Sequence, residues 1–149
     1  MIALGVSGFV VFDLHHSQQI ARRSYTDSVS GLELIGELQY QAQEARRTLL
    51  YALATTDSNR QVEYADQSRA ADEQVARLQS EYRRLAAAPP EIKVAGQLEG
   101  DWRAYLKVRD ELIASMLEGS PQHAVERDLR EGVPAFQRVR DDLRITAGH

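Results

Sequence analysis

The chain has 149 residues, no cysteine and a formal net charge of −4. This length suits one domain with a sizeable core, and a hydrophobic content of 43% argues against disorder. The acidic balance gives no electrostatic reason to expect a nucleic-acid partner. The lack of cysteine excludes disulfides, thiol nucleophiles and cysteine-ligated metals.

An apolar segment, residues 2–12, lies at the start of the chain. As a helix it would reach ~16 Å, about half of the ~30 Å hydrocarbon core of a bilayer. No basic region or small-residue cleavage site marks it as a signal peptide. We therefore expect residues 1–12 to be the outer part of a transmembrane helix that continues into the first helix of the domain. A native terminus that caps the bundle is the alternative.

Four later stretches repeat apolar residues at alternating three- and four-residue steps, which is typical of helices packed in a bundle. We expect these helices at residues 13–56, 58–87, 91–118 and 121–147. The expected core positions are Ile35, Leu38, Ala42, Ala45, Leu49 and Ala52 in the first helix; Tyr64, Ser68, Ala71, Val75, Leu78, Tyr82 and Leu85 in the second; Leu98, Trp102, Tyr105, Leu112 and Met116 in the third; and Val125, Leu129, Phe136, Val139 and Leu143 in the fourth.

Turn signals separate the four stretches. Asp57 lies in a cluster of N-cap formers, Pro89 and Pro90 end the second stretch, and Gly119 is a C-cap candidate before the fourth. Pro134 should kink or split the fourth helix near residues 132–133. Short loops require antiparallel neighbours. The sequence therefore predicts an all-α fold, in which residues 13–149 form an antiparallel up-down-up-down four-helix bundle with an extended first helix.

The first helix also carries residues that suit a second copy of the chain. Its N-terminal excess over the second helix would form a stalk toward the membrane, so the turns at Asp57 and Gly119 would lie at the membrane-distal end. Small residues on the stalk would let another helix approach closely. We expect a parallel homodimer beside this helix, through stalk residues Ser28 and Gly31 and a second stripe of Tyr40, Arg47, Leu50 and Ala54.

Several segments resemble one family: residues 44–53, Asp57 at the distal turn, Trp102 and Tyr105 before residues 109–111, and residues 133–136. The chain resembles the four-helix-bundle sensor family found outside the membrane in bacterial methyl-accepting chemotaxis receptors and related sensor histidine kinases. The resemblance covers nearly the whole chain. It implies a homodimer, one transmembrane helix on each side of the domain, and a cytoplasmic output module downstream. The domain would then lie in the periplasm or outside the cell, attached to the inner membrane.

Ligand candidates lie at the distal end of the predicted bundle. In the aspartate-receptor branch of the family, first-helix arginines at the dimer interface bind ligand carboxylates. Arg46 matches the first of them by its place before Thr48, whereas the later ones have no counterpart. Two guanidiniums off the core seam, Arg46 and Arg47, would become four in a dimer and suit an anion. The alternative is an exposed pair with contacts along its own helix, for instance Gln43 with Arg47.

Arg109 falls on an expected core position of the third helix. A buried guanidinium needs a carboxylate partner. The candidates on the distal half of the second helix are Asp57, Glu63 and Asp66. Arg109 could instead line a pocket with Trp102 and Tyr105, or snorkel beside a shifted seam. We expect a small anionic ligand at Arg46, Arg47, Tyr51 and Arg109; a periplasmic binding protein is the other possible partner.

We expect no catalytic site, metal or cofactor in this segment. No glutamate stands three residues before a histidine, as di-iron bundles require, and His15, His16, His123 and His149 are too far apart to converge. No phosphate-binding loop or nucleophile motif occurs. The sequence predicts the extracytoplasmic ligand-sensing domain of a bacterial transmembrane receptor, a chemoreceptor or sensor histidine kinase, that signals by helix movement. A structural dimerisation or protein-interaction bundle that binds no small molecule is the alternative.

Overall fold

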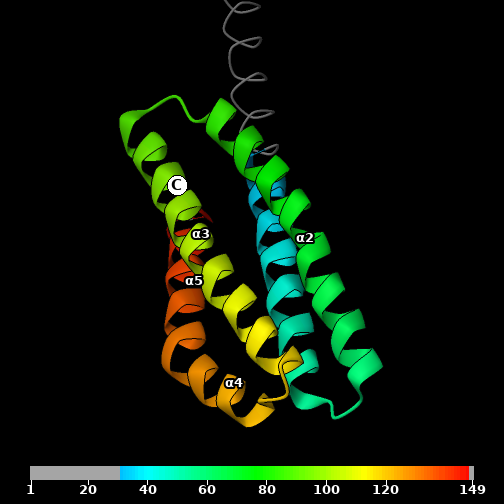
Figure 1. The fold of residues 1–149 in the computed structure, drawn as a ribbon. Coiled ribbons are helices and arrows are strands. Elements are labelled where there is room, and N and C mark those ends of the chain that lie inside the picture. The colour runs from blue at the N-terminus through cyan, green and yellow to red at the C-terminus, as the bar shows by residue number, and fades with distance from the viewer. Residues whose placement is uncertain (1–30, 148–149) are drawn as a thin grey trace, which may run out of the picture. The chain divides into compact units, whose positions relative to one another are not determined.

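The computed structural model describes residues 31–147, and within this range it contains helices and no strand. The helices are an N-terminal helix (residues 31–54), α2 (Ser58–Leu85), α3 (Pro89–Leu117), α4 (Pro121–Arg127), a π-helical turn (Asp128–Gly132) and α5 (Val133–Ala147). The last three form the fourth helix of an antiparallel bundle (Figure 1). The predicted all-α four-helix bundle is confirmed. Residues 1–12, expected in the membrane, and Ser28, expected at a dimer interface, lie outside the described residues.

The connections between the helices follow the expected turn chemistry. Asp57 is the N-cap of α2, where its side chain accepts hydrogen bonds from the backbone N–H groups of Asn59 and Arg60. Gly119 has a φ of 91°, a left-handed conformation that favours glycine, directly after α3. The connections at Asp57 and Gly119 lie at the same end of the bundle, and the connection between α2 and α3 lies at the other (Figure 1).

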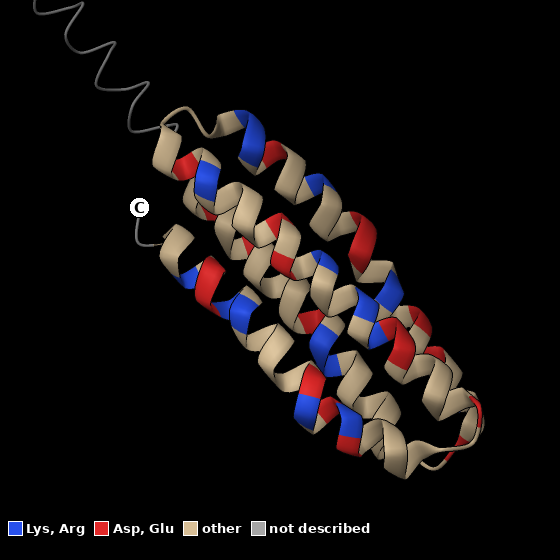
Figure 2. Cartoon of the chain, turned by 60° about the vertical axis from the view of Figure 1, so that its left-hand side comes forward, with Lys and Arg blue, Asp and Glu red and all other residues tan. Residues whose placement is uncertain are grey.

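In three of the four helices, the buried residues largely occupy the expected core positions. All six expected positions of the N-terminal helix and all five of α3 are buried. In α2, Ser68, Ala71, Val75 and Leu78 are buried, Tyr64 and Tyr82 are half-buried, and Leu85 is exposed at the end of the helix. Acidic and basic residues are interspersed along the helices (Figure 2).

The fourth helix departs from its predicted seam at the N-terminal end. Val125 and Leu129 were expected in the core, but Leu129 is 66% exposed, and the buried positions are Ala124 and Asp128. The reason is the π-helical turn, which inserts one extra residue and shifts every earlier position by about 100°. A regular period extended back from Phe136 therefore selects the wrong face.

Pro134 explains where this turn lies. Proline has no N–H to donate one turn back, so the α-helical hydrogen-bond ladder is interrupted here. The N–H of Val133, directly before it, instead reaches the carbonyl of Asp128, five residues back. The predicted split near residues 132–133 is confirmed, and it takes the form of a π-helical turn between α4 and α5.

Candidate functional site

A buried ion pair joins the N-terminal helix to the π-helical turn. The guanidinium of Arg46 donates to both carboxylate oxygens of Asp128, with N–O distances of 2.7 and 3.0 Å, and both side chains are buried. Burial acts to lower the pKa of Arg46, but the hydrogen bond that Arg46 donates to Asp128 and the nearby negative charge outweigh it, so the pKa is raised. Arg46 is therefore a fixed, fully charged group inside the bundle.

Aromatic rings surround this ion pair. The guanidinium carbon of Arg46 lies 5.9 Å from the ring centroid of Tyr105 and 5.7 Å from that of Phe136. Tyr105 is also packed against Trp102, with 5.5 Å between the ring centroids. Its hydroxyl group is buried without a hydrogen-bond partner in the described part of the chain. Burial raises the pKa of Tyr105, which keeps the phenol neutral beside the ion pair.

Arg109 forms a second buried cluster between α3 and α2. Its side chain is 1% exposed, and it makes bidentate contacts of 2.6 and 2.6 Å to Asp72. It also donates to the side chain of Asp110 and to the carbonyl of Ser68. The five hydrogen bonds match the five N–H donors of a guanidinium. The predicted core position of Arg109 is confirmed. The predicted partners Asp57, Glu63 and Asp66 were wrong, since the partner on α2 is Asp72.

Ser68 connects the two clusters. Its carbonyl accepts from Arg109, and its hydroxyl donates to the carbonyl of Ala45 over 2.7 Å. Ala45 directly precedes Arg46, so a polar path runs from α3 through α2 and the N-terminal helix to the π-helical turn. We call these residues the polar layer: Arg46, Asp128, Ser68, Arg109 and Asp72. The layer contacts all four helices of the bundle.

The four predicted ligand residues separate into two groups. Arg46 and Arg109 lie inside the bundle with carboxylate partners, so the interpretation of Arg46 as off the core seam was wrong. Arg47 and Tyr51 lie on the surface of the N-terminal helix, where Arg47 stacks 5.8 Å from the ring centroid of Tyr51. Arg47 also bonds Glu44 at 2.6 Å, one turn back along its own helix. The four side chains do not form one pocket.

Sequence reasoning missed Asp72, Asp128 and Gly132 as parts of the polar layer and its surroundings. A Cβ atom on residue 132 would lie 2.0 Å from Oδ1 of Asp128, so glycine leaves the room that this carboxylate occupies. The available signals were a serine on the α2 seam and the Gly-Val-Pro sequence at residues 132–134. Both mark a polar or irregular place in the core, although neither names the partner.

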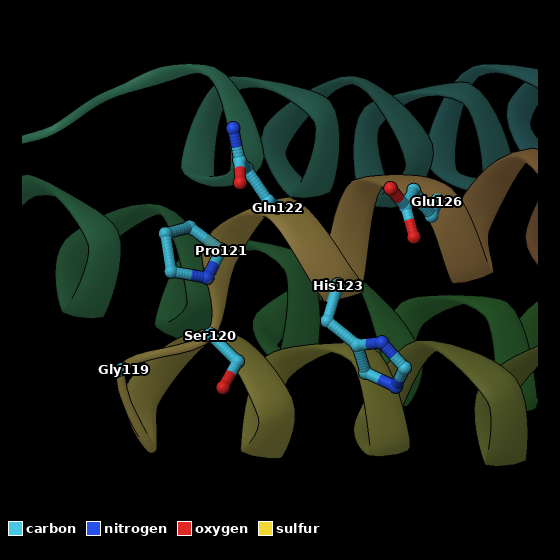
Figure 3. Close-up of a pocket in the computed structure, with 6 residues that line it drawn as sticks. All are labelled: Gly119, Ser120, Pro121, Gln122, His123 and Glu126. Atoms are coloured by element: carbon cyan, nitrogen blue, oxygen red, sulfur yellow. The ribbon is translucent and has the colours of Figure 1, made fainter.

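Several shallow pockets lie on the surface of the described part of the chain. A pocket of about 460 Å³ lies at the start of α4 (Figure 3), where Gln122 and His123 point in different directions. A groove of about 550 Å³ between α2 and α3 reaches Asp72 and Trp102. A third pocket, of about 240 Å³, lies at the Asp57 end and is lined by Tyr51, Ala54, Thr55, Arg60 and Tyr64. The rings of Tyr51 and Tyr64 meet edge to face, 5.6 Å apart.

Of the four predicted ligand residues, only Tyr51 lines one of these three pockets. The pocket at Tyr51 combines two aromatic rings with the guanidinium of Arg60, and Arg47 stacks on its edge. These groups suit a small ligand with a negative charge and a flat face. Residues 31–147 hold no cluster of three potential metal ligands.

No helix within residues 31–147 combines the length and the apolar character needed to cross a bilayer. No curated protein matches the chain. The model of one family, described as a four-helix-bundle sensory module for signal transduction, matches residues 1–146. Together with the bundle described above, this match shows that the chain belongs to the family of four-helix-bundle sensory modules for signal transduction.

Proposed function

We propose that this sensory module is the extracytoplasmic ligand-sensing domain of a bacterial transmembrane receptor, either a chemoreceptor or a sensor histidine kinase. The ion pair between Arg46 and Asp128 carries the proposal. It ties the N-terminal helix to the one segment of the fourth helix whose hydrogen-bond ladder is already irregular. A signal that alters this contact would move α5 relative to the N-terminal helix.

The π-helical turn suits such a movement. Turns of this kind are rare, and they are frequent at functional sites. Small helix displacements at packed interfaces are a common form of signal transmission. A shift at Asp128–Gly132 would carry through α5 toward Ala147, at the end of the bundle opposite Asp57. In the proposed orientation, that end faces the membrane.

The proposed ligand is a small anion with a flat acceptor group, bound at the Asp57 end. Arg47 and Tyr51 remain accessible there, beside Arg60 and Tyr64 of α2. Arg46 and Arg109 already bind carboxylates. Their part in sensing would therefore be indirect, through the polar layer that links the helices under this surface.

The proposed assembly is a parallel homodimer anchored in the inner membrane, with this domain in the periplasm or outside the cell. Tyr40, Arg47, Leu50 and Ala54 recur on one exposed face of the N-terminal helix. Tyr40 is 60% exposed, and burial of such rings against a second copy would be favourable. The same stripe also supports the alternative function, a dimerisation or protein-interaction bundle that binds no small molecule.

Thermal unfolding of the 149-residue chain in the presence of small carboxylates would test direct sensing. A ligand stabilises the folded chain according to its concentration and dissociation constant, so one compound class should raise the melting temperature in a saturable way. Arg60→Gln and Tyr51→Ala should remove that rise. Arg84→Gln, which changes an exposed arginine at the other end of α2, is the matched control. A rise that survives both changes would place the site elsewhere, and no rise with any compound would favour the interaction bundle.

A further inference from the structure

Two aspartates from different helices meet between α3 and α5. Asp142 of α5 is 8% exposed, and its Oδ2 atom is buried without a hydrogen-bond partner in the described part of the chain. Asp101 of α3 brings its carboxyl within hydrogen-bonding reach of Asp142. Two ionised carboxylates have no hydrogen to donate to each other. A proton on one of them would supply the missing donor.

A third carboxylate adds negative charge beside this pair, and the cation that faces that carboxylate is the exposed Arg144, 3.9 Å from Asp141. Asp141, the next residue on α5, also acts on Asp142 through its charge. The ion pairs of the described residues include neither Asp101 nor Asp142. From α2, the titratable group nearby is Tyr82, whose hydroxyl is within hydrogen-bonding reach of Thr146, one turn beyond Asp142.

The N-terminal helix contributes no buried charge at this level of the bundle. Its buried side chains in this half are Leu34, Ile35, Leu38 and Ala42. The carboxylates of the same stretch, Glu33 and Glu37, belong to exposed residues. The acid pair therefore lies against apolar packing on one side and against another carboxylate, Asp141, on its own helix.

This environment favours the protonated form. Burial, the hydrogen bond to Asp101 and the charges of Asp101 and Asp141 raise the pKa of Asp142 from 3.8 to about 7. Between these two pH values the folded chain holds a proton that the unfolded chain has released. The stability that this proton provides is therefore complete at low pH and is lost as the pH rises through about 7.

We propose that Asp101 and Asp142 form a proton-binding site that makes this module responsive to external pH. In the protonated state the pair bonds α5 to α3, a helix against which α5 packs. Ionisation places two like charges inside that interface and loosens it. The proton binding stands by itself, whereas its use as a signal rests on the helix displacement proposed above.

Carboxyl-carbon NMR of the 149-residue chain would measure the titration directly. The signal of Asp142 should titrate with a midpoint about three pH units above that of an ordinary aspartate. Hydrogen-exchange protection of α5, corrected for the intrinsic rate at each pH, should fall through the same midpoint. Titration of Asp142 near 3.8, its ordinary value, would overturn the proposal.

Two variants distinguish the effect of the Asp101–Asp142 pair on stability from the effect of a neighbouring negative charge on α5. Asp142→Asn keeps a hydrogen-bonding side chain and should abolish the loss of melting temperature between about pH 5 and about pH 8. Asp141→Asn is the control. It removes the same charge from the neighbouring residue, whose side chain is 51% exposed, and this variant should keep the loss of melting temperature. Equal losses in both variants would contradict the proposal.

If Asp142→Asn does not fold, Asp101→Asn should instead lower the titration midpoint of Asp142, and an unchanged midpoint would count against the pair. Failure of every small carboxylate to bind would leave these outcomes unaffected, so the two proposals can fail separately.

Discussion

The carboxylate of Asp128 lies directly against Gly132, and a Cβ atom on residue 132 would lie 2.0 Å from Oδ1 of Asp128. The π-helical turn that contains both residues thus places an acid inside the bundle, opposite Arg46. Without a glycine at this position, the acid could not keep this conformation. The irregular turn and the buried ion pair depend on each other.

Gly132→Ala should therefore destabilise the fold strongly. The new methyl group would displace Asp128, and the charge of Arg46 would remain buried without its partner. Breaking a buried ion pair from one side costs about 3–5 kcal/mol. Urea unfolding at neutral pH would measure the loss as a lower midpoint.

Gly100→Ala is the matched control for this change. Gly100 also lies within a helix, α3, but a Cβ atom there meets no other atom within 4 Å. Alanine should stabilise this position by ~0.5–1 kcal/mol, because it restricts the unfolded chain and favours the helix. Similar effects of the two substitutions would show that the contact between residues 132 and 128 does not contribute to the free energy of unfolding.

A double-mutant cycle should reveal strong coupling between Arg46 and Asp128. Arg46→Met and Asp128→Asn should each destabilise the chain by about 3–5 kcal/mol, because each leaves one buried partner unpaired. The double variant should lose much less than the sum, since neither charge remains. The unfolding free energies of the four proteins give the coupling directly. Additive losses would mean that the two side chains act independently.

Arg109 and Arg127 should differ although both bind two carboxylates. Arg109→Met should cost several kcal/mol, because Asp72 and the carbonyl of Ser68 would lose their donor inside the bundle. Arg127 bonds Glu111 and Glu131 at the surface, where water and salt screen the contacts. Arg127→Met should leave the unfolding midpoint almost unchanged. Comparable losses in the two variants would show that the ion pairs of α4 matter more than their exposure implies.

The sequence predicted the bundle well because helix packing follows a repeated spacing. Leu38, Leu49, Leu98 and Leu112 each recur at the expected step, and all four are buried. The turn at Asp57 was predictable for a local reason, since its side chain binds N–H groups two and three residues away. Neither inference required knowledge of a distant contact.

The polar layer was less predictable because its partners depend on register between helices. Asp72 lies about 1.7 helical turns from Asp66, the nearest of the expected partners of Arg109. Which residue of α2 lies beside Arg109 depends on how far α3 is displaced along α2, and the connection between the two helices sets this displacement. Asp128 became a partner of Arg46 through the extra residue of the π-helical turn. Pro134 indicated an interruption there, but not that it would rotate an aspartate into the core.

The exposed stripe of the N-terminal helix predicts that the chain self-associates through this face. If Tyr40 and Leu50 meet a second copy of the chain, Tyr40→Glu and Leu50→Glu would place charges in an apolar contact and repel the equivalent residues near a two-fold axis. Sedimentation velocity across a concentration series should then show weaker dimerisation than in the wild type. Val62→Glu is the control, because Val62 is also an exposed apolar residue but lies on α2. An equal weakening by Val62→Glu, or a wild-type dimer that both N-terminal-helix changes leave intact, would show that the contact uses another face.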